Sequence, residues 1–160
     1  MRLQQMTARR PIAGAVFTKS IRKGRDMTPF ETVRAALNHL SARDFPAFTA
    51  LMHEDAVKVS PFAPSFAKET LKGRAEWEPV LRGFMIETLK EFTWFIDELY
   101  EVPGTGVVFG IGRSRGLGKD GREYANKYAW LFNVTDGKIS RFVEFYNPKA
   151  IEQFFAGAAR

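Results

Sequence analysis

Apolar and polar residues alternate along three consecutive segments in the second half of the chain, residues 106–115, 122–134 and 138–148. An alternation of period two indicates strands with one buried face. The segments are separated by the pairs Asp120-Gly121 and Asp136-Gly137. Asp-Gly favours tight type I′ hairpins, because both central residues of that turn take a positive φ. The pattern therefore predicts a curved antiparallel sheet that contains three long strands in series.

The part of the chain before these strands has helical spacing. Thr28 precedes Pro29, and Glu31 follows three positions after Thr28. This is the arrangement of a capping box with proline at the first helical position. A stripe of apolar residues at spacings of three and four comes next and consists of Phe30, Val33, Leu37 and Leu40. We therefore expect a helix that begins near residue 29 and buries one face.

The other elements complete a mixed fold. The expected elements are a short helix capped by Asp44, a strand over residues 56–60, a loop over residues 61–72, a helix over about residues 74–89, a strand over residues 91–102 and a helix from Pro148. Pro79 favours a regular helix that begins only near Glu78. The predicted order is α-α-β-α-β-β-β-β-α. It describes an α+β cone-shaped barrel in which the curved antiparallel sheet wraps around the long helix and leaves its other face free.

Composition limits the class of protein. The 160 residues suit one domain, and the 15 Phe among 45% hydrophobic residues provide an aromatic core or an apolar pocket. No apolar run approaches the roughly 18 residues that a membrane-spanning helix requires. The chain has no cysteine, which excludes disulfides, a thiol nucleophile and cysteine-based metal sites. We therefore expect a cytoplasmic protein without a membrane partner.

The net charge of +6 belongs to the first 26 residues. Residues 1–26 contain seven basic residues and one acidic residue, whereas residues 27–160 contain 17 of each kind. The domain itself is therefore not basic, and nucleic acid is not an expected partner. The basic extension has three interpretations: a disordered tail, a non-native segment that precedes a true start at Met27, or an Arg-rich targeting segment.

Several short segments resemble the SnoaL-like branch of the NTF2-like superfamily, which includes ketosteroid isomerase-like proteins. They are residues 40–45 (LSARDF), 53–57 (HEDAV), 71–74 (LKGR), 136–139 (DGKI) and 144–147 (EFYN). The resemblance covers residues 28–156 and makes residues 27–160 one SnoaL-like domain. It implies a pocket at the open end of the cone and a homodimer. Members of this superfamily include isomerases, polyketide cyclases, epoxide hydrolases and binding proteins, so the fold does not fix the function.

The resemblance also shows departures from the ketosteroid isomerase pattern. That pattern has a general-base Asp before a Pro at the end of the first strand, where this chain has Ser60 before Pro61. It has an oxyanion-binding Tyr in the first helix, near the position of Ala36. Many SnoaL-like proteins have an Asp at the end of the last strand, where this chain has Asn147. A serine without a base does not abstract a carbon-bound proton, so these departures disfavour steroid isomerisation.

Aromatic and polar residues share one face of the middle hairpin strand. They are Asn126, Tyr128, Trp130 and Phe132, and we place this face inside the cone. One interpretation is aromatic core packing. The other is an apolar pocket in which Asn126 and Tyr128 are polar anchors and Trp130 contacts the ligand, because ligand sites usually combine apolar walls with a few polar groups.

Glu144 is the candidate catalytic acid or base. It shares a strand face with Phe142 and Tyr146, and burial of a carboxyl group favours the protonated form. The alternative is a structural ion pair with Arg113 or Arg115. The two interpretations overlap, because a Glu144–Arg113 pair at the mouth of the cone would also bind a polar ligand group. We therefore take Arg113 and Tyr146 as candidate ligand-binding residues.

The sequence predicts neither a metal site nor a cofactor. His39 and His53 are the only histidines, and they are distant in the sequence. The outward positions of the middle hairpin strand (Ala125, Lys127, Ala129 and Leu131) include apolar residues, which favours a homodimer through the outer sheet face.

Three functional hypotheses follow. The first is a protein that binds a small apolar molecule in the cone pocket. The second is an isomerase, cyclase or hydrolase that acts on a small apolar ketone, epoxide or polyketide-like substrate, with Glu144 as acid or base. The third is an interaction module that uses its sheet face or basic extension. The sequence leaves open whether the protein is an enzyme.

Overall fold

A six-stranded curved sheet forms most of the structure, a computed structural model that describes residues 26–157. The strands are β1 (Met52–Val59), β2 (Thr70–Lys72), β3 (Leu89–Val102), β4 (Val107–Gly118), β5 (Glu123–Thr135) and β6 (Lys138–Tyr146). Their order across the sheet is β2-β1-β6-β5-β4-β3. Neighbouring strands are antiparallel except β1 and β6, which are parallel. The predicted basic extension, apart from Asp26, lies outside the described residues.

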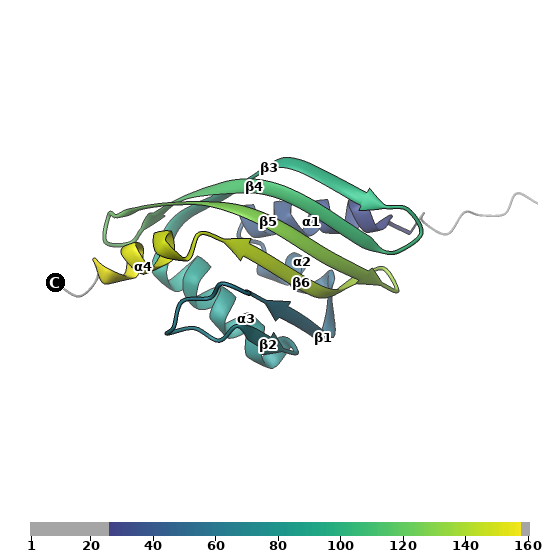
Figure 1. The fold of residues 1–160 in the computed structure, drawn as a ribbon, viewed down its shortest axis with the longest axis horizontal. Helices are drawn as coiled ribbons and strands as arrows, with labels where there is room; N and C mark the ends of the chain where they lie inside the picture. The colour runs from purple at the N-terminus through teal and green to yellow at the C-terminus, as the bar shows by residue number, and fades with distance from the viewer. Residues whose placement is uncertain (1–25, 158–160) are drawn as a thin grey trace, which may run out of the picture.

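The helices gather on the concave face of this sheet. They are α1 (Pro29–Ser41), α2 (Phe45–Ala50), α3 (Arg74–Arg82), the π-helical segment η1 (Gly83–Thr88) and α4 (Pro148–Ala156). Figure 1 shows α1, α2 and α3 on one side of the sheet and α4 at one end of it. The predicted α+β cone is thereby confirmed. Among the described residues, no helix lies on the convex face of β3, β4 and β5. The homodimer expected at this face stays a prediction.

The first helix forms as its sequence predicts. The Thr28 amide donates to Glu31 Oε2 (2.8 Å), and the Glu31 amide donates to Thr28 Oγ1 (3.2 Å), which completes the capping box. Val33, Leu37 and Leu40 are each at most 1% exposed. Since α1 packs against four strands, β3 to β6, its buried stripe fixes the position of the helix beneath the sheet.

The structure corrects the prediction for the region between the first strand and the long third helix. A short edge strand, β2, forms where a loop was expected, because Thr70, Leu71 and Lys72 pair with the end of β1. The third helix begins at Arg74 and continues through Pro79 instead of beginning near Glu78. An amide at position 79 would pair with the Ala75 carbonyl, so the proline removes one helical hydrogen bond of α3.

The two Asp-Gly hairpins differ. Asp136 and Gly137 both have positive φ (51° and 74°), as the type I′ prediction requires. In the β4–β5 turn only Gly121 has a positive φ (86°), so the type I′ prediction is wrong there. The Asp120 carboxylate instead accepts hydrogen bonds from the Arg122 amide (3.1 Å) and Nε (2.9 Å). This side-chain bridge stabilises a different turn at the same place in the sequence.

Glycine on the inner face of β4 lies opposite large aromatic residues of β5. Gly110 pairs with Trp130, Gly112 with Tyr128 and Gly116 with Tyr124. A Cβ atom on Gly112 would lie 2.6 Å from Trp130 Cη2 and would also meet the Phe95 carbonyl. The missing side chains of β4 therefore provide the space that the rings of the neighbouring strand occupy.

A methyl group at Gly112 should therefore destabilise the fold. We expect Gly112→Ala to lower the free energy of unfolding by about 1–3 kcal/mol, because the inserted group overpacks the core. Gly83→Ala is the matched control, since its Cβ would meet nothing nearer than Glu87 Oε2 at 4.0 Å. Urea unfolding of both variants measures the difference. Equal stability of Gly112→Ala and the unchanged protein would contradict this packing.

Candidate functional site

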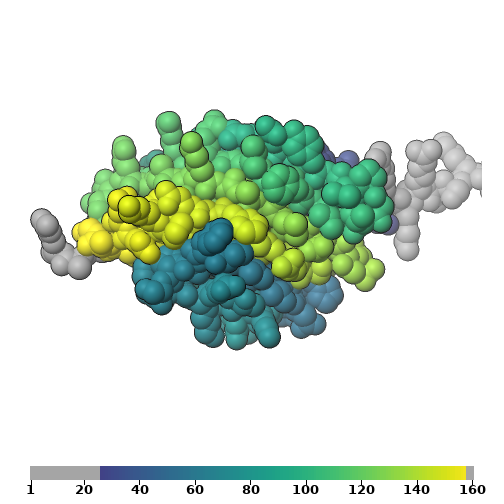
Figure 2. All heavy atoms as spheres, in the orientation of Figure 1, coloured from purple at the N-terminus to yellow at the C-terminus, as the bar shows by residue number. Residues whose placement is uncertain are grey.

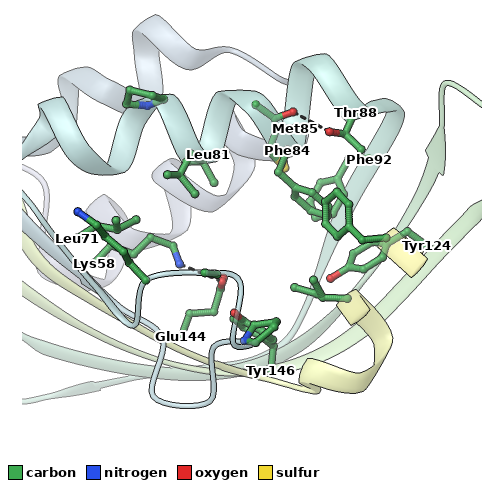
Figure 3. A pocket seen from close by; sticks show the side chains of 18 of the residues that line it. Lys58, Leu71, Leu81, Phe84, Met85, Thr88, Phe92, Tyr124, Glu144 and Tyr146 are labelled. Carbon is green, nitrogen blue, oxygen red and sulfur yellow. Dashed lines mark hydrogen bonds and ion pairs between the residues drawn. The ribbon is translucent and has the colours of Figure 1, made fainter. Parts of the chain in front are cut away.

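A cavity of about 650 Å³ lies between α3, η1 and the inner face of the sheet. Figure 3 shows its lining side chains converging from these elements. The lining comes from the end of β1 and the loop after it (Lys58, Pro64, Phe66, Ala67, Lys68), β2 (Leu71), α3 and η1 (Pro79, Val80, Leu81, Gly83, Phe84, Met85, Glu87, Thr88), β3 (Phe92, Trp94), β5 (Tyr124, Tyr128), β6 (Glu144, Tyr146) and α4 (Ile151, Phe155). A volume of this size suits a small organic molecule.

The apolar wall is built around Phe84. Its ring centroid lies 5.2 Å from that of Tyr124, 6.4 Å from that of Phe92 and 6.1 Å from that of Phe155. Phe84 belongs to the π-helical segment, a wider helix that often occurs at functional sites. The Thr88 hydroxyl donates to the Gly83 carbonyl (3.0 Å) within the same segment. The sequence predicted an α-helix over these residues, and the structure shows a π-helical segment instead.

The loop between β1 and β2 closes one side of the cavity. The Phe66 ring lies 5.8 Å from the Phe155 ring of α4 in an edge-to-face contact. Figure 2 shows this blue segment lying against the yellow α4 on the molecular surface. Phe66 is nevertheless 63% exposed. The contact therefore joins two segments that are distant in the sequence at the rim of the cavity.

An ion pair forms the most polar part of the wall. Lys58 Nζ lies 3.5 Å from Glu144 Oε1 and donates to Ser60 Oγ at 2.8 Å. The two charged side chains are only 13% and 11% exposed. They come together because β1 and β6 are parallel neighbours, with Lys58 opposite Phe142 in the register. Figure 3 shows the pair at the edge of the cavity.

A chain of hydroxyl groups crosses the inner face of β4 and β5. Ser114 Oγ and Tyr128 Oη are 3.0 Å apart, as are Tyr128 Oη and Tyr124 Oη. Asn126 Nδ2 donates to Tyr124 Oη (3.0 Å) and to the Asn147 carbonyl (3.0 Å), and Asn126 Oδ1 accepts from the Asn147 amide (3.0 Å). The main chain of Asn147 thus fixes the orientation of the Asn126 amide.

This chain of hydroxyl groups has one hydrogen more than its internal hydrogen bonds require. The hydroxyl groups of Ser114, Tyr124 and Tyr128 carry three hydrogens, but only two contacts join them. Asn126 donates to Tyr124 and so fills one acceptor position with its own hydrogen. The remaining hydrogen lies on Ser114, Tyr124 or Tyr128, according to which group donates in each contact. Where it lies on Tyr124 or Tyr128, both of which line the cavity, it is available to an acceptor on a ligand.

Burial keeps these phenols neutral. It raises the pKa of Tyr124 to about 12 and that of Tyr128 well above its usual value. The pKa of Tyr146 is also raised, mainly by burial and further by the negative charge of Glu144. Near neutral pH the three groups are therefore hydrogen-bond donors and do not act as bases.

The structure brings together only part of the predicted site. Glu144, Tyr128 and Tyr146 line the cavity. Asn126 is buried behind Tyr124 as a support, and Trp130 is fully buried in the core, so neither forms the wall. The prediction that this face of β5 points inward was therefore right. Of the four residues on the face, Tyr128 lines the cavity and the other three are buried in the core.

The prediction that Arg113 lies at the mouth of the pocket is wrong. Inward positions of β4 are occupied by Gly112 and Ser114, so Arg113 points to the convex face. There it forms an ion pair with Asp97 and lies over the Phe95 ring at 5.1 Å. The partner of Glu144 is accordingly Lys58 and not an arginine of β4.

Sequence reasoning missed Lys58. The usable signal was its position two residues after Ala56 and two before Ser60, both of which are buried on the inner side of β1. A lysine at an inward position of a strand requires a partner, and Glu144 is that partner. Within residues 26–157, no three His, Asp or Glu side chains gather as a metal site, and no helix is both long and apolar enough to cross a membrane.

Comparisons with known proteins agree with the fold. The SnoaL-like domain matches residues 33–142, so the chain belongs to the SnoaL-like family of the NTF2-like superfamily. The uncharacterized protein YesE of Bacillus subtilis (strain 168) is 24% identical over 130 residues, which are 80% of this chain and 87% of YesE.

Two solved structures illustrate the likeness. A Bacillus subtilis protein provisionally described as an isomerase has a TM-score of 0.70 and 24% identity. The match covers 82% of this chain and 97% of the Bacillus subtilis chain. An LEH-like epoxide hydrolase of M. tuberculosis has a TM-score of 0.62 and 18% identity. The match covers 81% of this chain and 90% of the hydrolase chain. At these identities the likeness shows the fold alone.

The buried phenol of Tyr124 should make the fold sensitive to alkali. Above about pH 10 the Tyr124 phenol ionises in the unfolded chain. In the folded protein the same phenol stays protonated, because burial raises its pKa to about 12. Its contribution to stability is therefore complete below about pH 10 and is lost as the pH rises to about 12. Tyr124→Phe should make the decline shallower by up to about 1.4 kcal/mol per pH unit.

Urea unfolding between pH 8 and pH 12 tests this expectation. Tyr100→Phe is the control, because Tyr100 is 57% exposed on the outer side of β3. This substitution should change the slope of unfolding free energy against pH less than Tyr124→Phe does. Identical slopes for Tyr124→Phe and the unchanged protein would show that this phenol is not buried in solution.

Proposed function

We propose that the cavity binds a small, mainly apolar molecule that carries an oxygen atom able to accept a hydrogen bond. One observation carries this proposal: a cavity of about 650 Å³ has walls made mostly of aromatic and aliphatic side chains, with polar groups at only a few places. Such cavities bind organic ligands through burial of apolar area, while the polar groups fix the orientation.

The polar groups define what the ligand should carry. The surplus hydroxyl hydrogen of the Tyr124–Tyr128 chain suits a carbonyl or hydroxyl oxygen. The Lys58–Glu144 pair provides a donor and an acceptor side by side. An apolar ring body would lie against Phe84 and Leu81, which Figure 3 shows on the wall opposite this pair. The ligand class is therefore an apolar ketone, phenol or related oxygenated molecule.

A second candidate function is an isomerase, cyclase or hydrolase that acts on the same class of molecule. Glu144 favours it, because a carboxylate that lines an apolar cavity and contacts a cationic partner is a chemically competent acid or base. The provisionally described isomerase and the LEH-like epoxide hydrolase among the similar structures support this candidate by analogy alone. Ser60, at the end of β1, accepts a hydrogen bond from Lys58 and provides no base of its own.

Ligand binding should raise thermal stability. We expect 2-naphthol at about 100 times its dissociation constant to stabilise the fold by roughly 2.7 kcal/mol, which raises Tm by several degrees. Naphthalene, which lacks the oxygen, should stabilise it less. Leu81→Trp should abolish the shift by filling the cavity, whereas Leu131→Trp on the convex face should retain it. A shift that Leu81→Trp leaves unchanged would place binding elsewhere.

The catalytic candidate has a separate test. In an assay that shows turnover of a ketone or epoxide, Glu144→Gln should lower kcat by about 100-fold or more, because it removes the acid or base but keeps the shape. Ligand affinity should change little. Glu123→Gln is the control, since Glu123 is exposed at the start of β5. Full turnover by Glu144→Gln would exclude Glu144 as the catalytic group.

A further inference from the structure

Lys58 differs from every other described lysine. The seven other lysines of residues 26–157 are exposed, whereas the Lys58 side chain is 13% exposed and lines the cavity. Lys68 lines the rim of the same cavity, but its side chain is 71% exposed. Among residues 26–157, one lysine amine is therefore enclosed by the apolar cavity and one lies on its rim.

The surroundings of Lys58 hold its nitrogen in one place. Ser60 Oγ lies 2.8 Å from Nζ, Glu144 Oε1 lies 3.5 Å away, and the Phe142 ring centroid lies 5.6 Å away. These contacts fix the direction of a side chain that would otherwise be among the most flexible in a protein. A fixed amine at the cavity wall faces a bound molecule in one orientation, which is a large advantage over an amine in solution.

Glu144 offers a route to the neutral amine. Keeping two opposite charges in a cavity wall requires the loss of water from both groups. Nζ must lose one proton before it can attack a carbonyl carbon, and the Glu144 carboxylate, 3.5 Å away, is the base beside it. A lysine desolvated in an apolar pocket is the usual form of an amine nucleophile.

We propose that Lys58 is a carbonyl-reactive amine that forms a reversible imine with an apolar aldehyde or ketone bound in the cavity. The inference rests on the proposed function, because it requires that the carbonyl compound bind there. It adds to that function the reactive group of the ligand, a carbonyl, and the nitrogen with which the carbonyl reacts, Lys58 Nζ.

The bonds and protons balance within the site. The Nζ lone pair attacks the carbonyl carbon, a C–N bond forms, and the carbonyl π electrons move to oxygen. Glu144 gives that oxygen the proton taken earlier from Lys58 and receives the second proton that nitrogen loses. It returns this proton to the hydroxyl group, the C–O bond breaks as the nitrogen lone pair forms the C=N bond, and water leaves. The product is the protonated imine, whose positive charge lies beside the Glu144 carboxylate. No oxidant or reductant takes part.

The hydroxyl groups of the cavity complete this arrangement. The surplus hydrogen of the Tyr124–Tyr128 chain can point toward the ligand oxygen, and it remains on a neutral phenol. Ser60 Oγ accepts a hydrogen from Nζ and so holds the nitrogen without competing as a base. The aromatic wall around Phe84 covers the ligand, which limits the access of water that would hydrolyse the imine.

Reductive trapping tests the proposal directly. The protein is incubated with 2-naphthaldehyde and cyanoborohydride, which reduces an imine to a stable secondary amine. Peptide mass mapping then locates the naphthylmethyl group. We expect Lys58 to be labelled at least about tenfold faster than Lys68, since a bound carbonyl meets an oriented amine. Equal labelling of Lys58, Lys68 and the exposed lysines would overturn the proposal, and this comparison needs no variant.

Variants separate the amine from the pocket. Lys58→Arg keeps the positive charge but cannot form the imine, so the fast labelling should disappear. Glu144→Gln should slow labelling at Lys58 without changing it at Lys68. Circular dichroism and thermal unfolding of each variant verify that the fold is retained. Fast labelling that persists in folded Lys58→Arg would overturn the assignment to this nitrogen.

A matched alcohol distinguishes this inference from the proposed function. 2-Naphthalenemethanol has the shape of the aldehyde but cannot form an imine. If it raises Tm and slows labelling of Lys58, both proposals are supported. If it raises Tm while the aldehyde labels Lys58 no faster than Lys68, the cavity binds ligands and the imine is excluded. If neither compound binds, both proposals fail.

Discussion

The pairing of glycine with aromatic residues across β4 and β5 is the constraint on which the rest of the structure depends. Gly110, Gly112 and Gly116 leave three positions on the inner face of β4 without side chains. The residues of β5 opposite the first two are Trp130 and Tyr128. The rings occupy the space above the glycines, so the sheet can curve tightly while its inner face remains filled. The indole of Trp130, wholly buried, fills the middle of this curve.

This packing also determines the chemistry of the cavity. A ring layer held against β4 brings the phenols of Tyr124 and Tyr128 into one hydrogen-bonded chain instead of separate solvated groups. The far side of the cavity depends on a different feature, the parallel pairing of β1 with β6, which places Lys58 beside Glu144. A neutral hydroxyl chain and an enclosed amine–carboxylate pair therefore belong to one apolar cavity. Neither group forms from residues adjacent in the sequence.

The sequence predicted the features that depend on local patterns. Strand alternation, the capping box at Thr28 and the Asp136-Gly137 turn each depend on neighbouring residues, and all three formed as expected. Most of the features that were missed depend on distant partners, although the Asp120-Gly121 turn differs through its own neighbour Arg122. The inward position of Lys58 has meaning only beside Glu144, and Arg113 was placed inside because its strand register could not be fixed from its own alternation. The cavity itself depends on which rings pack against glycine, which no single segment specifies.

The cone contains an open, mainly apolar cavity with an amine–carboxylate pair in its wall. A crystal structure of the protein with 6-bromo-2-naphthol tests it most directly, because anomalous scattering locates the bromine independently of the rest of the map. We expect the ring system between Phe84 and the sheet, with its oxygen within hydrogen-bonding distance of Tyr124, Tyr128 or Lys58. A cavity filled by the side chains of η1 and α4, with the ligand elsewhere or absent, would contradict it.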